Sequence, residues 1–497
     1  MGTRCASVLL ACVLTACGGD KGDSGDTGGT ATGGTATGGT ATGGTATGGT
    51  GDTVTTPTDG AGVPTYYEFA SGESGASSVS YSGQTFRQLL IEDMTAYVSG
   101  MTDRLNAGWF PVPGEVTEDM MFYLEFDSTV GGSIDHSFTA DLPILQTTYD
   151  DVSSDKDLFG KMAGNDEVGQ HKDWSVDFVG WPAPGVTTPE SLVRAWVAML
   201  DDAAVNWSNG DIPTGPDGEP VGAVYVTAEG HDLKQLLEKF TRGAVAFSQG
   251  TDDYLDDDEP GKGLLSDHTA NDDGKNYTPL EHQWDEGFGY FGATRDYYDL
   301  SDDQIADIGT SDYDGDGLID LKYEVCWGHS VNAAKRDRGA VVGTDFTKQA
   351  WEAFAQGRML IAENYGGLSD DQFAELQGHR DQAVAAWENA IASTVVHYIN
   401  DTLQDMGDYG TPDYSFNDHA KHWGELKGFA LVMQFNPRSP MSDGDFEVFH
   451  GLVGTAPVVA GLDDDYADDL RTARALLGTA YGFDEANLGD DDGENGW

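Results

Sequence analysis

Apolar residues recur at every third or fourth position through most of the chain beyond residue 65, and this period constrains the fold more than any other feature. The period matches the turn of an α-helix, so each such segment has one face that can be buried. The segments with this pattern are residues 84–105, 188–207, 231–249, 345–362, 370–405, 416–435 and 464–481. Strand signals are short and few, such as that at 223–228. The sequence therefore predicts an all-α fold with long irregular connections.

The amino-terminal segment carries one basic residue, Arg4, and then a short run of small and apolar residues that ends in Leu14-Thr15-Ala16-Cys17. Such a run is too short to stay in a bilayer as a spanning helix, and it is typical of a secretory signal. Its end resembles a bacterial lipobox, which implies that residues 1–16 are removed and that Cys17 is lipidated. An ordinary signal peptide, cut near Ala16, is the alternative.

The lipid would hold the protein on a membrane of the bacterial cell envelope. Gly18 follows Cys17 at a position where aspartate is associated with inner-membrane retention in some bacteria, so we expect the outer membrane. Residues 17–64 contain almost nothing that can form a core, and residues 30–49 are the pentad TATGG written four times. This composition predicts a flexible, polar spacer between the lipid and the folded part.

The formal net charge is −59, from 85 acidic and 26 basic side chains. Such a chain repels nucleic acid, and metal cations are its natural partners. Cys326 is the one cysteine left after the predicted processing and lipidation, so an internal disulfide is not expected. We expect one helical domain over residues 65–490 and an acidic tail over residues 491–497.

Two helix starts are marked by the same pair of residue types, Thr188-Pro189 and Thr278-Pro279. In each pair the threonine can cap the helix and the proline suits its first position. Glu281 stands where the acid of a capping box belongs, three residues after Thr278. A helix is therefore predicted to begin at each proline.

The helix that begins at Pro279 would carry His282, Asp285 and Glu286 on one face, because residues three and four apart are neighbours on a helix. Imidazole and carboxylate ligands suit iron, zinc or manganese. Helical bundles of the di-iron type build metal sites from such pairs. A histidine that only forms hydrogen bonds beside acidic residues is the alternative interpretation.

A second segment repeats the combination of histidine, tryptophan and acid. Within residues 416–435, His422 and Glu425 lie one turn apart and share a face. Two such half-sites on two helices of one bundle can meet. The predicted transition-metal ligands are therefore His282, Asp285, Glu286, His422 and Glu425. His397, on another predicted helix, is expected to pack rather than to bind metal.

Residues 312–324 have the spacing of a calcium-binding loop. Asp312, Asp314, Asp316, the Leu318 carbonyl and Asp320 occupy its first, third, fifth, seventh and ninth positions, and Gly317 stands where the loop must turn. The twelfth position is Tyr323, and Glu324 comes one residue late. These residues predict a structural calcium site, with an acidic surface turn as the alternative.

Three strings, LEHQWDEGFGYFG, IDLKYEVCWGHSVNAAKRDRG and HWGELKGFALVMQFNP, resemble the imelysin-related bacterial lipoproteins. More narrowly, they resemble a branch known as a domain of unknown function. The resemblance covers about residues 66–480 and implies two packed helical bundles and a link to iron acquisition. Some imelysin-type proteins carry a peptidase label. Their Gly-x-His-x-x-Glu hallmark corresponds here to Leu280, His282 and Asp285, with Glu286 just beyond.

From these features we expect an envelope lipoprotein that binds a transition metal, iron or an iron-bearing ligand, for uptake with an envelope partner. One alternative is a metal-dependent hydrolase of the peptidase type, in which Glu286 or Glu425 would activate a bound water. The chain lacks the His-Glu-x-x-His and Gly-x-Ser-x-Gly motifs, so we expect binding rather than catalysis. The other alternative is a calcium-stabilised surface interaction module without enzymatic activity.

Overall fold

The computed structural model describes residues 53–166, 170–216, 218–459 and 463–497. They belong to one compact unit, Gly48–Trp497. The predicted signal peptide, Cys17 and most of the predicted spacer lie outside the described residues. The described residues form helices and irregular connections without a sheet, which confirms the all-α prediction. No helix among them is long and apolar enough to cross a membrane.

The longer helices are α1 (Ser82–Ser99), α3 (Glu115–Leu124), α6 (Pro189–Ser208), α7 (Leu233–Arg242), α8 (Pro279–Phe291), α9 (Gly328–Gly339), α10 (Phe346–Glu363), α11 (Asp370–Asp408), α12 (Phe416–Val432), α13 (Asp443–Val453) and α14 (Asp464–Tyr481). The short helices are α2 (Met101–Asn106), α4 (Ser128–Gly131), α5 (Tyr149–Val152) and α15 (Glu485–Leu488). Two π-helical turns, η2 (Gly243–Phe247) and η3 (Gly250–Tyr254), follow α7. The strand signal at 223–228 was misleading, because an isolated bridge between Val226 and Asp232 is the only pairing there.

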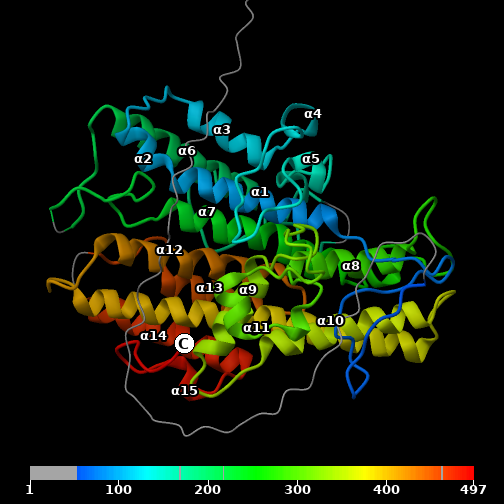
Figure 1. Cartoon of the computed structure of the whole chain (residues 1–497). Coiled ribbons are helices and arrows are strands. Elements are labelled where there is room, and N and C mark those ends of the chain that lie inside the picture. Colours follow the sequence, from blue (N-terminus) through cyan, green and yellow to red (C-terminus); the bar gives the residue numbers. More distant parts are fainter. Residues whose placement is uncertain (1–52, 167–169, 217, 460–462) are drawn as a thin grey trace, which may run out of the picture. The chain divides into compact units, whose positions relative to one another are not determined.

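The helices pack in two groups (Figure 1). In the first, α1 packs against α3 and α7, and α6 packs against α3 and α7. In the second, the 39-residue α11 is central and packs against α9, α10, α12 and α14. The contact between α7 and α12 joins the groups. The middle of α11 is buried on all sides, as expected for a helix in the core of a large domain.

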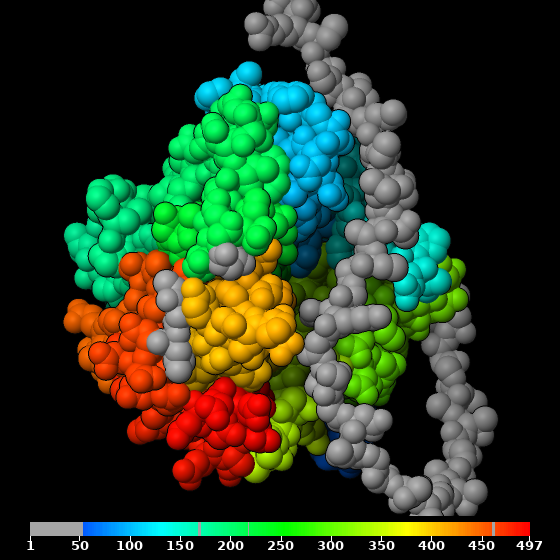
Figure 2. Space-filling view, turned by 90° about the vertical axis from the view of Figure 1, so that its left-hand side faces the viewer, coloured from blue at the N-terminus to red at the C-terminus, as the bar shows by residue number. Residues whose placement is uncertain are grey.

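Both ends of the folded part extend beyond the predicted helical domain. The Pro64 carbonyl accepts a hydrogen bond of 2.8 Å from Trp351 Nε1. Trp497 is 5% exposed, and its Nε1 donates to the Arg336 carbonyl at 3.0 Å. Figure 2 shows the last part of the chain, which includes α15 (red), directly below the chain around residue 410 (amber), and Gln404 Nε2 donates to the Gly493 carbonyl at 2.7 Å. The predicted acidic tail is therefore packed against the helical domain.

Candidate calcium site

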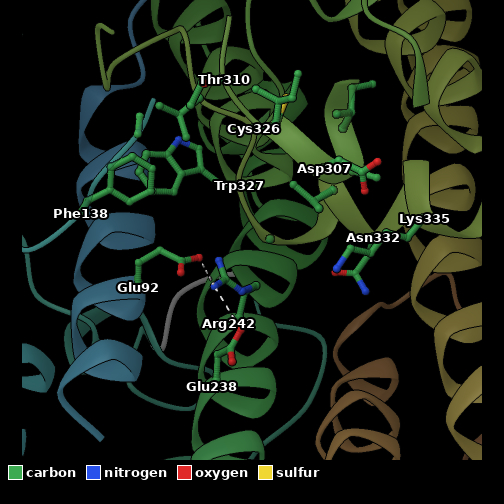
Figure 3. A pocket seen from close by; sticks show the side chains of 18 of the residues that line it. Glu92, Phe138, Glu238, Arg242, Asp307, Thr310, Cys326, Trp327, Asn332 and Lys335 are labelled. Carbon is green, nitrogen blue, oxygen red and sulfur yellow. Dashed lines mark hydrogen bonds and ion pairs between the residues drawn. The ribbon is translucent and has the colours of Figure 1, made fainter. Parts of the chain in front are cut away.

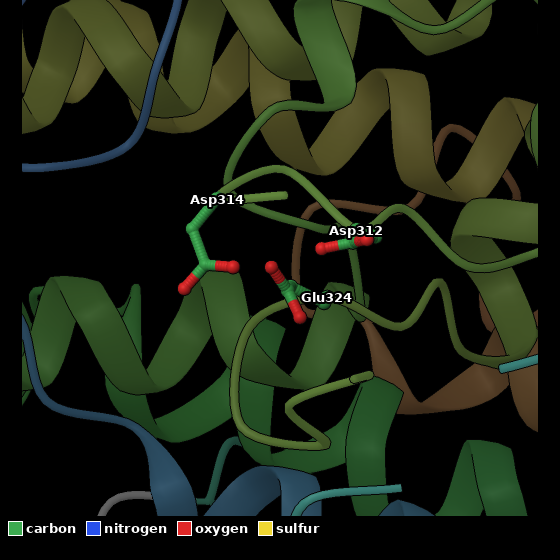
Figure 4. Close-up of side chains that lie close together, drawn as sticks. All are labelled: Asp312, Asp314 and Glu324. Carbon is green, nitrogen blue, oxygen red and sulfur yellow. The ribbon is translucent and has the colours of Figure 1, made fainter. Parts of the chain in front are cut away.

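The loop predicted to bind calcium lies between α8 and α9, and its two ends are held together by backbone pairing. Thr310 and Val325 form an antiparallel bridge, and Ser311 N donates to the Glu324 carbonyl at 3.0 Å. This pairing places Glu324 beside the first residues of the loop. Carboxylate oxygens of Asp312, Asp314 and Glu324 all lie within 4.8 Å of one another (Figure 4). In the described part of the chain, no other three or more such ligand groups come this close together.

The electrostatics of this cluster favour a cation. Glu324 is 3% exposed, and burial, together with repulsion from Asp314, raises the pKa of its carboxyl to about 7. Backbone N–H groups of Tyr313 and Asp320 donate to its two oxygens at 3.1 and 2.7 Å. The Oδ1 atom of Asp312 is buried and has no hydrogen-bond partner among the described residues. A hard cation that prefers oxygen ligands would offset both the repulsion and the buried unpaired oxygen.

Two of the residues predicted as ligands make other contacts. Asp316 is exposed, and its Oδ1 accepts a hydrogen bond of 2.8 Å from Leu318 N. Asp320 is buried, and its Oδ1 accepts from Gln146 Nε2 at 2.9 Å and from Lys322 N at 2.8 Å. The structure thus brings Asp312 and Asp314 together with Glu324, rather than with Asp316 and Asp320. In the sequence, Glu324 was visible only as an acid one residue beyond the usual twelfth position.

The predicted ligands on α8 lie at a buried ion-pair network. The capping box is present as predicted, with Glu281 N donating to Thr278 Oγ1 at 3.3 Å and Thr278 N donating to Glu281 Oε2 at 2.8 Å. Asp285 is fully buried and accepts hydrogen bonds from Arg358 Nε at 2.8 Å, Ser80 N at 3.1 Å and Tyr67 OH at 3.1 Å. Its oxygens are therefore already satisfied by the protein.

His282 and Glu286 lie at the edge of the same helix. The ring of His282 stacks on Tyr277, with centroids 4.4 Å apart, and its Nδ1 is 2.9 Å from the Ser80 carbonyl. Its Nε2 is 3.7 Å from Glu286 Oε1, and that oxygen accepts from Gln84 Nε2 at 2.7 Å. Both side chains have partners close to α8.

The two predicted half-sites do not meet. The reason is topological, because α8 packs against α1 and α10, whereas α12 packs against α7 and α11. His422 Nδ1 lies 2.8 Å from Asp405 Oδ2. Glu425 faces two lysines, with carboxylate oxygens 3.7 Å from Lys239 Nζ and 4.0 Å from Lys421 Nζ. The five residues predicted as one set of transition-metal ligands are therefore divided between two places in the fold.

A polar pocket of about 350 Å³ adjoins the calcium-type loop (Figure 3). Thr310 and Val325, which close the loop, are part of its wall, and α1, α7 and α9 supply other sides. Arg242 donates from Nη2 to Glu92 at 2.7 Å and from Nη1 to Gln88 at 2.6 Å, so its charge is already paired. The Cys326 thiol lines the pocket, but burial raises its pKa to about 12, which disfavours a nucleophilic thiolate.

Fold and site together define an all-helical domain with an acidic, calcium-type loop. Residues 190–388, from the start of α6 to the middle of α11, match the family model described as a domain of unknown function (DUF4856). This match spans less than half of the chain and includes the loop. The chain matches no curated protein and no solved structure.

Proposed function

We propose that this protein is a calcium-stabilised interaction module of the bacterial cell envelope, without enzymatic activity. The observation that carries the proposal is the convergence of Asp312, Asp314 and Glu324 within 4.8 Å. Three carboxylates this close repel one another unless a cation lies among them. Calcium suits such a site, because it takes six to eight oxygen ligands in flexible geometry, with water completing the shell.

The loop is positioned to stabilise a large region of the domain. Ile319 N donates to the Pro143 carbonyl at 2.8 Å, and Leu145 N donates to the Ile319 carbonyl at 2.9 Å. Gln146 adds the side-chain contact with Asp320. An ion in the loop would therefore hold the connection between α8 and α9 against the distant segment 143–146. Extracellular modules bind calcium with dissociation constants of about 10⁻⁴–10⁻³ M, so even a weak site is filled outside the cell.

The proposed location rests on the sequence. The lipobox-like Leu14-Thr15-Ala16-Cys17 supports a lipid on Cys17, and Gly18 supports the outer membrane. A relation to the imelysin proteins is also proposed, supported by the three quoted strings and by the two packed groups of helices.

Uptake of iron through the five predicted ligands has less support, because Asp285 is paired with Arg358 and the two half-sites are apart. The hydrolase alternative has less support, because Glu286 Oε1 already accepts a hydrogen bond from Gln84 beside His282, and Glu425 faces two lysines. The calcium-stabilised module is therefore the function that the geometry supports best.

The proposal is tested by elemental analysis and thermal unfolding of the chain from residue 17, with Cys17→Ser to remove the lipid. We expect one calcium ion per chain and a melting temperature that rises with calcium and falls on chelation. At a calcium concentration 100 times the dissociation constant, the stabilisation is about 2.7 kcal/mol. Asp312→Asn combined with Asp314→Asn should abolish the response. A melting temperature that ignores calcium would refute the proposal.

A further inference from the structure

A second set of metal-ligating side chains lies where α11 packs against α12. His397, Asp401 and Asp405 are spaced four residues apart on α11, so they share one face of that helix. His422 projects toward them from α12. No residue of this set belongs to the calcium-type loop, and only His422 was predicted as a ligand.

Asp401 lies between the two imidazoles. Its Oδ2 atom is 3.3 Å from His397 Nε2 and 3.9 Å from His422 Nε2. Two ligands on one tetrahedral zinc ion, with bonds of about 2.0–2.1 Å, are separated by roughly 3.3–3.4 Å. The distance from Asp401 to His397 has this value, whereas the distance from Asp401 to His422 is too long for a hydrogen bond. Asp401 is therefore placed to share an ion with His397, and His422 would move about half an ångström closer to join them.

The ligand atoms of His397, Asp401 and His422 do not all lie within 4.8 Å of one another, although Asp401 Oδ2 is within 3.9 Å of each Nε2. The two Nε2 atoms are therefore more than 4.8 Å apart. An ion bound by all three would draw the imidazoles together about Asp401. Both rings are near the surface, with 28% of the His397 side chain and 22% of the His422 side chain exposed.

Asp405 orients His422 for such a role. Its Oδ2 lies 2.8 Å from His422 Nδ1, so the carboxylate accepts a hydrogen bond from Nδ1–H and the ring presents Nε2 to Asp401. Histidines that bind metal almost always donate their other ring N–H to a carboxylate or carbonyl in this way. Asp405 is also more buried than the two histidines, with 14% of its side chain exposed. Tyr398 stacks beside the His422 ring and restricts its plane.

We propose that His397, Asp401 and His422 bind one divalent transition-metal ion, and that Asp405 holds His422 in the binding tautomer. Two imidazoles, one carboxylate and an open fourth position fit zinc. Calcium, which takes oxygen ligands, does not suit the two nitrogen ligands. His397, expected from the sequence to pack, is a ligand in this arrangement, and Glu425 is not.

The test is calorimetric titration of Zn²⁺ into the chain from residue 17, with Cys17→Ser, without a histidine tag and with saturating calcium. We expect one Zn²⁺ per chain. His397→Gln and His422→Gln should each weaken binding at least 100-fold, and Asp405→Asn about 10- to 100-fold. His282→Gln is the matched control, because His282 also has an acid one turn away, and its variant should bind as the unmodified chain does.

Binding of Co²⁺ gives an independent readout through its visible absorption, which reports ligand number and geometry. A tetrahedral spectrum that is lost in His422→Gln would support the site. Unfolding curves in metal-free buffer should show that the variants are folded. If a histidine variant does not fold, Asp405→Asn, which keeps all three proposed ligands, tests the site in its place. Absence of stoichiometric zinc, or equal affinity in His422→Gln and the unmodified chain, would show that Asp401 and Asp405 only form ion pairs with the histidines.

Discussion

Arg358 Nε lies 2.8 Å from Asp285 Oδ1, and both side chains are fully buried. The same guanidinium donates from Nη1 to Glu281 at 3.1 Å and from Nη2 to Ser78 Oγ at 2.6 Å. One arginine of α10 thus forms ion pairs with two carboxylates of α8 and fixes the chain that leads into α1. The acidic face of α8, which suggested a metal site, is a structural junction between three parts of the domain.

Arg358→Met should destabilise the domain strongly, because it leaves two carboxylates buried without a cation. Removal of one partner from a buried ion pair costs about 3–5 kcal/mol. The measurement is the free energy of unfolding in urea. Lys348→Met is the control, because Lys348 is exposed and its ion pair with Glu352, at 3.7 Å, is also exposed. This substitution should lower the free energy of unfolding by no more than about 0.5 kcal/mol. Equal effects of the two substitutions would contradict the structural role of Arg358.

The helices could be predicted because the signals that define them are local. Thr188 and Thr278 accept the expected capping hydrogen bonds, and Pro189 and Pro279 are the first residues of α6 and α8. The partner of Asp285 could not be predicted, since Arg358 is 73 positions away and periodicity does not reveal which helices pack together. Spacing alone thus gave the elements but not the contacts between their polar faces.

The calcium-type loop illustrates the same limit at shorter range. Its position was predicted from the spacing of the acidic residues, but the spacing also pointed to Asp316 and Asp320. The structure selects Glu324 because the bridge between Thr310 and Val325 closes the loop one residue later than in the usual pattern. A backbone pairing of this kind leaves no clear mark on the sequence.

Substitutions in the loop distinguish these two sets of ligands. Asp312→Asn and Glu324→Gln should each weaken calcium binding at least tenfold, because each removes a charge from the cluster. Asp316→Asn removes the same charge from an exposed side chain outside the cluster and should change affinity less than threefold. Calorimetric titration with calcium measures all three. A larger loss in Asp316→Asn than in Glu324→Gln would favour the spacing-based prediction.

The packed C-terminus gives a prediction of stability. Trp497→Ala should lower the free energy of unfolding by about 3 kcal/mol, because it removes a buried aromatic side chain and leaves the Arg336 carbonyl without its donor. Trp497→Phe keeps a ring but not the Nε1 donor, so it should have an intermediate effect. Urea unfolding measures both. Asp492→Asn, at an exposed position of the same segment, is the control, and no effect of Trp497→Ala would show that the segment is dispensable.

Lys427 predicts an unusual dependence of stability on pH. The side chain is fully buried in α12, and Nζ donates to the Gly454 carbonyl at 2.6 Å. Burial lowers the pKa of this amine from 10.5 to about 7. His450, whose Nδ1 is 3.4 Å away, is itself buried, and burial, followed by the Lys427 charge, keeps its pKa well below the usual value. It therefore stays neutral above pH 7.

Between about pH 7 and pH 10.5 the unfolded chain holds the Lys427 proton and the folded chain does not. The stability contributed by the neutral amine is thus complete above about pH 10.5 and is lost as the pH falls through about 7. Methionine cannot titrate, so the stability of the unmodified chain relative to Lys427→Met should rise from pH 7 to pH 9, by up to about 1.4 kcal/mol per pH unit. Urea unfolding at several pH values measures this slope. Lys348→Met corrects for the removal of a surface charge, and a difference that stays constant with pH would mean that Lys427 is charged in the folded domain.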